Sequence, residues 1–164
     1  MPWGAGLCVT LKIACHFMEL VERLGAKALG PRGRQNLYRG DDDLFSWASV
    51  FGGQGFGVFP ELRVTHLIPA ERLSRRYLLR FVHDHRFSAG VLNYLLSADE
   101  PKGMDLFCIA HVILHGVRNG RFAMQCKWAA ARGTDKAKRY IVERELRPVE
   151  LKKPKAAHAN QGCD

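Results

Sequence analysis

Apolar residues recur with two different periods in the first part of the chain. Between positions 7 and 13 every second residue is apolar, and this period of two predicts a strand. Between positions 17 and 24 the apolar residues recur at helical spacing, and Gly25 is typical of a helix stop. Residues 30–40 contain three glycines, one proline and three arginines, which predicts a loop. The pattern therefore predicts a strand, a helix and a loop in that order.

Further apolar positions predict more helices and one or two short strands. Apolar residues between positions 44 and 51 form one helical face, and Gly52 and Gly53 end that helix. Residues 56–69 are apolar and rich in strand formers, but Pro60 interrupts them. A helix begins near Ser74, and helical patterns then cover residues 89–97, 104–117, 121–132 and 135–145.

This order of elements predicts an α/β fold with few strands, followed by a helical C-terminal region. We expect residues 1–70 to form the α/β part and residues 71–147 to form the helical region. After Pro148 the composition becomes polar and basic, so residues 148–164 are expected to be a disordered tail.

Composition narrows the function classes without choosing one. The 164 residues carry a formal charge of +9, which permits binding to nucleic acid or to an anionic membrane, and also suits an enzyme with a phosphorylated substrate. No nucleic-acid module is recognisable, so no specific nucleic-acid partner is expected. The longest apolar run, residues 106–114, is too short to span a bilayer. Five scattered cysteines without a C-x-x-C motif indicate reduced thiols and a cytoplasmic location.

Three consecutive carboxylates are the most unusual local feature. Asp41, Asp42 and Asp43 follow Gly40 and precede the apolar helix. One aspartate at a helix N-terminus is a good cap, but adjacent aspartates repel each other. The triplet could therefore be a cap, a cation cradle, or a carboxylate that acts as a general base. Spacing alone leaves these alternatives open.

Other candidate residues are weaker as single signals. His66 ends a predicted strand, where it could be a structural histidine or a functional group. The string "PWGAG" places Gly4, Ala5 and Gly6 beside Trp3, as an ordinary turn or as a platform for a flat ligand such as a sugar. His111 and His115 share a helix face but lack the glutamate of a zinc-protease motif, so packing is the preferred interpretation.

Taken in order, the strings "PWGAGLCV", "GDDDLFSW" and "GFGVFPELRVTHLIPAERLSRRYLLRF" resemble the C-terminal half of a family 2 glycosyltransferase. The resemblance runs from about Pro2 to Tyr94. It implies a partial GT-A fold, a nucleotide-sugar donor, a glycan or lipid-linked acceptor, and a divalent cation, Mg²⁺ or Mn²⁺. It also implies a place in the cytoplasm or at the inner membrane periphery.

The resemblance also implies roles for individual residues. Asp42 matches the catalytic base, with Asp41 and Asp43 as its neighbours or register alternatives, and His66 matches a metal ligand. The residues expected to contact substrates are Trp3, Gly4, Ala5, Gly6 and Trp47, together with Arg72 and Arg75, which would face the diphosphate.

The family's nucleotide-binding half, with its Asp-x-Asp motif, is not matched by any part of the chain. A truncated or fragmentary transferase is therefore expected. The alternative is a non-catalytic basic α/β remnant that binds an anionic membrane or a protein partner through its helical C-terminal half.

Overall fold

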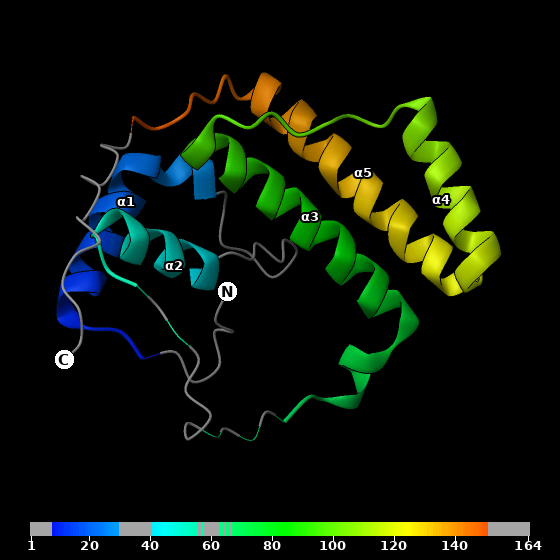
Figure 1. Cartoon of the computed structure of the whole chain (residues 1–164), viewed down its shortest axis with the longest axis horizontal. Helices are drawn as coiled ribbons and strands as arrows, with labels where there is room; N and C mark the ends of the chain where they lie inside the picture. The colour runs from blue at the N-terminus through cyan, green and yellow to red at the C-terminus, as the bar shows by residue number, and fades with distance from the viewer. Residues whose placement is uncertain are drawn as a thin grey trace, which may run out of the picture. The chain divides into compact units, whose positions relative to one another are not determined.

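The computed structural model describes residues 8–29, 41–55 and 67–150, together with residues 57, 63 and 65. These residues contain the helices α1 (Leu11–Leu29), α2 (Asp41–Phe51), α3 (Arg75–Ser97), α4 (Leu106–Asn119) and α5 (Arg121–Glu143), and the 3-10 helix η1 (Ala70–Leu73) (Figure 1). They belong to two compact units. The first includes α2 and α1 as far as Arg23, and the second includes η1 and α3 to α5.

The predicted α/β fold is wrong, because the described residues contain helices and no strand. The expected first strand is replaced by α1, which begins at Leu11 and continues through Gly25 to Leu29. The alternation covered only four apolar residues, and the last of them, Ile13, also belongs to the helical series that continues with Phe17. The partial GT-A domain that the resemblance implied is corrected with it. Most of the expected strand region, residues 56–69, lies outside the described residues.

The first unit is held by contacts between α1 and α2. The ring of Phe17 on α1 stacks on that of Phe45 on α2, with centroids 3.9 Å apart and planes 6° from parallel. After α2 ends at Phe51, as the sequence predicts, the hydroxyl of Ser49 donates to the carbonyl oxygen of Gly55 at 3.1 Å. This bond fixes the turn that Gly52 and its neighbour begin.

In the second unit, α3 and α5 lie side by side and run parallel (Figure 1). Arg75 at the start of α3 contacts Gln125 near the start of α5, with 2.8 Å between Nε and Oε1. At the other end, the hydroxyl of Tyr94 donates to the carbonyl of Leu146 at 3.2 Å. The connection after α3 returns along the unit, so α4 is antiparallel to α5 and packs against it. The buried apolar residues of α3, α4 and α5 are Phe87, Val91, Leu95, Leu96, Val112, Ala137 and Ile141.

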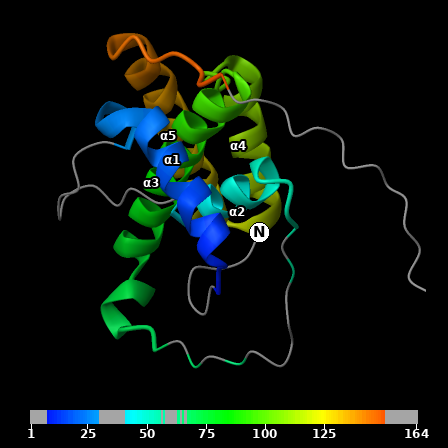
Figure 2. The ribbon, with the colours of Figure 1, turned by 90° about the vertical axis from the view of Figure 1, so that its left-hand side faces the viewer.

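The helix ends of this unit have local causes in the sequence. The Ser74 hydroxyl accepts a hydrogen bond from the backbone N–H of Tyr77 and so caps the N-terminus of α3. The sequence predicts this helix start correctly. In the chain, η1 comes directly before it (Figure 2). The carboxylate of Asp105 accepts the N–H of Cys108 at 2.7 Å and caps α4. Gly120, with φ of +87°, is the single residue between α4 and α5, because this left-handed conformation favours glycine.

Small residues allow the backbones of α3 and α5 to approach closely. A Cβ atom at Gly133 on α5 would lie 2.2 Å from the carbonyl oxygen of His83 on α3. One turn further along, a Cβ at Gly90 would lie 2.9 Å from the Cβ of Ala137. The sequence predicted a break between residues 132 and 135, but α5 continues through Gly133 because that glycine is a packing residue.

A glycine also allows α4 to approach α5. A Cβ at Gly116 would lie 2.7 Å from the Cβ of Met124. Both residues lie four positions from Gly120, so α4 and α5 are in close contact within one helical turn of the residue that joins them.

The Gly133→Ala variant tests the close contact of α3 and α5. Alanine favours helix by about 1 kcal/mol over glycine, but its methyl group would meet backbone rather than a flexible side chain. We expect a net loss of about 1–3 kcal/mol in the free energy of unfolding, measured by urea denaturation followed by circular dichroism.

Gly55→Ala is the matched control, because a Cβ there meets no atom within 4 Å. We expect a change within about 0.5 kcal/mol for this variant. An equal or higher stability of Gly133→Ala would contradict the close helix contact.

Candidate functional site

The aspartate triplet forms the first turn of α2. The side chains of Asp41 and Asp42 lie outside the described residues, whereas Asp43 is half-buried. Trp47, one turn further along, stacks on Phe51 of the same helix with centroids 5.4 Å apart. Carboxylates in the first turn interact favourably with the helix N-terminus, and the capping role and the role of Asp42 as a base both stay predictions.

The other residues of the predicted transferase site are only partly described. Trp3, Gly4, Ala5, Gly6 and His66 lie outside the described residues. In the second unit, Arg72 is exposed on η1. The guanidinium of Arg75 contacts Gln125 and lies 5.6 Å from the ring centroid of Phe122. Arg75 therefore joins α3 to α5.

The predicted metal site has no counterpart in the described residues. No group of three His, Cys, Asp or Glu side chains there could hold a metal ion. Since His66 and two of the three aspartate side chains are not described, the divalent cation stays a prediction.

The most unusual described surface is the solvent-facing side of α4, which we call the outer face. At 3.6 residues per turn its members fall within an arc of about 120° that includes no polar residue. Leu106, Phe107 and Val117 have exposed fractions of 82%, 86% and 82%. The outer face consists of Leu106, Phe107, Ala110, Ile113, Leu114 and Val117. The opposite side of α4 carries the buried Val112 and the contact with α5.

Positive charge accompanies this apolar surface. Between Asp105 and Asp135 the sequence has no acidic residue and four basic ones, namely Arg118, Arg121, Lys127 and Arg132. Arg118 lies next to the outer face around the helix, and Arg121 follows directly after the Gly120 link. None of the described helices is long and apolar enough to cross a bilayer.

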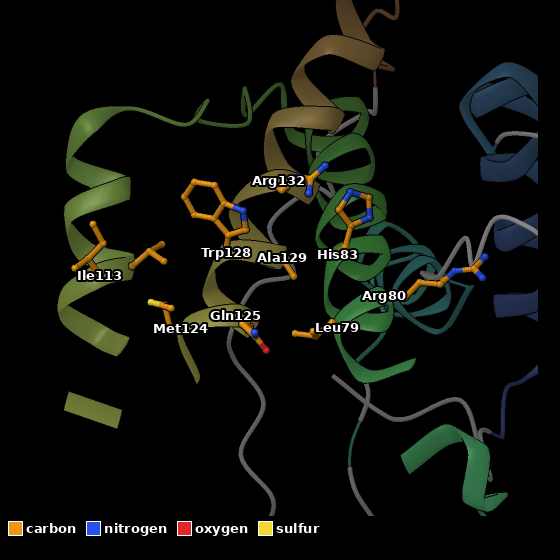
Figure 3. Close-up of a pocket in the computed structure, with 10 residues that line it drawn as sticks. Leu79, Arg80, His83, Ile113, Met124, Gln125, Trp128, Ala129 and Arg132 are labelled. Atoms are coloured by element: carbon orange, nitrogen blue, oxygen red, sulfur yellow. The ribbon is translucent and has the colours of Figure 1, made fainter. Parts of the chain in front are cut away.

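A cleft of about 730 Å³ lies between α3 and α4, with α5 as its floor (Figure 3). Trp128 and Ala129 of α5 line it, Leu79 and His83 lie on the α3 side, and Ile113 lies on the α4 side. The remaining lining residues are Arg80, Val112, Met124, Gln125 and Arg132. Most of the wall is apolar, and the volume is in the range of small-molecule sites.

The charged groups of the cleft differ in their partners. Asp84 lies 2.8 Å from Nδ1 of His83 and 3.4 Å from Nε of Arg80, so one carboxylate serves both. Arg132 makes no ion pair with any residue that the structure describes. Figure 3 shows Arg132 beside His83 at one end of the cleft, whereas Leu79 and Gln125 lie at the other. The cleft is therefore apolar along its length and positively charged at one end.

Sequence reasoning missed both surfaces. The apolar run at residues 106–114 was considered only as a membrane span and was judged too short for one. The helical series Met124, Trp128 and Arg132 was a usable signal for the cleft floor, because these residues are four apart and share one face.

The chain matches no known protein-family model, no curated protein and no solved structure. Any proposal about its function must therefore stand on the described geometry.

Proposed function

We propose that the second unit binds peripherally to an anionic lipid surface through the outer face of α4. The observation that carries this proposal is the unbroken exposed apolar arc on that helix, beside basic residues and with no acidic residue between Asp105 and Asp135 in the sequence. A helix with these features lies in the membrane interface with its apolar side toward the acyl chains.

The apolar side chains provide the first contribution. Each large apolar side chain that leaves water for an apolar environment contributes about 1.5–3 kcal/mol when burial is complete. The outer face offers five such side chains over a helix about 21 Å long. Even partial insertion would therefore favour binding by several kcal/mol.

The basic residues provide the second contribution and favour lipid over a second copy of the chain. Arg118 and Arg121 can reach headgroup phosphates while their methylene groups stay near the apolar surface. A symmetric dimer through α4 would instead bring together two stretches that each carry four basic residues between positions 106 and 134. No acidic residue from 106 to 134 could neutralise them there.

The glycosyltransferase activity implied by the sequence resemblance remains a separate prediction. The GT-A fold that accompanied it is wrong, and the described residues do not unite its expected site. Lipid binding needs neither that fold nor a metal ion, so we prefer it as the function.

Removing apolar side chains from the outer face should weaken membrane binding. For the double variant Phe107→Ser/Leu114→Ser we expect partitioning onto phosphatidylglycerol vesicles to fall at least about tenfold. Both side chains are exposed, so the free energy of unfolding should change little. Vesicle co-sedimentation measures the partitioning.

Val142→Ser is the matched control, because Val142 is equally exposed but lies at the far end of α5. It should bind vesicles like the unmodified chain. Unchanged binding of the double variant, or equal loss in the control, would overturn the assignment of the outer face. Because these vesicles are made of lipid alone, binding to them cannot result from capture by an acidic protein partner.

The arginines should determine the dependence on lipid charge. Each basic residue near an anionic surface contributes about 1 kcal/mol, so Arg118→Gln/Arg121→Gln should lose about thirtyfold in partitioning at low salt. The difference should shrink at high salt and on neutral phosphatidylcholine vesicles. Arg144→Gln, at the other end of α5, should retain binding. A loss that does not depend on lipid charge would contradict this electrostatic role.

A further inference from the structure

We propose that the cleft between α3 and α4 binds a single-chain amphiphile whose headgroup is a carboxylate or a phosphate. Its alkyl chain would lie along the apolar wall and its headgroup at Arg132. This inference concerns a different surface from the outer face of α4, and it does not depend on membrane binding.

The apolar wall suits an alkyl chain more than a polar ligand. Leu79, Met124 and Ala129 line the cleft from α3 and α5, and Val112 and Ile113 line it from α4. Aliphatic carbons bind such a wall by leaving water, with no polar partner required. A ligand with many hydrogen-bonding groups would leave most of them unsatisfied there.

The charge of the cleft selects the headgroup. Asp84 already compensates Arg80 and His83, whereas Arg132 has no ion pair among the described residues. Arg132 is exposed, so a headgroup that binds it stays partly hydrated while the chain enters the cleft. The planar guanidinium can donate two parallel hydrogen bonds to a carboxylate or to a phosphate.

One side of the cleft adjoins the outer face of α4. Ile113 belongs to both surfaces, since it lines the cleft and remains largely exposed. An amphiphile from a membrane and one from free solution would present the same chemistry to the cleft. The source is therefore decided by experiment, with and without vesicles.

Trp128 lines the cleft and provides a local reporter. In a background of Trp3→Phe and Trp47→Phe, its fluorescence is titrated with dodecanoate, dodecyl phosphate and dodecyltrimethylammonium below their micelle concentrations. We expect saturable binding of both anionic probes and at least about tenfold weaker binding of the cation. Repeating the titration with probe-loaded phosphatidylcholine vesicles tests delivery from lipid.

Two substitutions, each with a control substitution, separate recognition of the headgroup from recognition of the alkyl chain. Arg132→Gln should weaken both anionic probes about tenfold or more without weakening the cation, whereas Arg139→Gln should have no effect. Arg139 lies two turns later on α5 and pairs with Asp135 at 2.7 Å. Ala129→Phe should weaken all probes by filling the cleft, and Ala110→Phe on the outer face should not.

Thermal unfolding checks that each variant is folded. Arg132 is exposed, so Arg132→Gln is expected to fold and to test the proposal even if Ala129→Phe does not fold. Equal affinity for anionic and cationic probes, or no effect of Arg132→Gln, would overturn the proposal. Affinities that change with protein concentration would also overturn it, because they would indicate a second copy of the chain in the cleft. If vesicle binding through α4 fails while these titrations succeed, the cleft proposal stands alone.

Discussion

The close contact between the backbones of α3 and α5 at Gly133 fixes the geometry of the second unit. Because Gly133 lies directly against the carbonyl of His83, the α5 side chains next to it are held in one position relative to α3. Ala129 and Arg132 therefore line the same cleft as residues of α3. Gly116 allows a comparable approach of α4, which presents its outer face to solvent as a result.

The two proposed surfaces require the same pair of physical features, an apolar area and an adjacent positive charge. On α4 these features are spread along a helix, which suits an extended lipid surface. In the cleft they are confined to about 730 Å³, and at one end lies Arg132, which has no ion pair among the residues that the structure describes. This arrangement suits a single molecule. Ile113 contributes to both surfaces, so the outer face and the cleft adjoin at that residue.

Two local sequence signals predicted helix boundaries correctly, whereas the stop predicted at Gly25 is absent because α1 continues to Leu29. Ser74 and Gly52 act on their own neighbours, and the structure places a helix start and a helix end there. The strand before Ile13 was wrong because four alternating residues are too few to outweigh a longer helical series. The break predicted between residues 132 and 135 is absent from α5, and the packing role of Gly133 within that gap depends on His83, fifty positions earlier in the chain. The cleft depends on three helices together and has no local signature.

Lipid contact by the outer face of α4 is the central claim, and acyl-chain quenching tests it most directly. Tryptophan is introduced by Phe107→Trp after the native tryptophans are replaced by phenylalanine, and Val142→Trp provides the reference. The account predicts that lipids brominated on their acyl chains quench the tryptophan at position 107 and leave the one at position 142 bright. Equal quenching by brominated lipids at the two positions on anionic vesicles would contradict it.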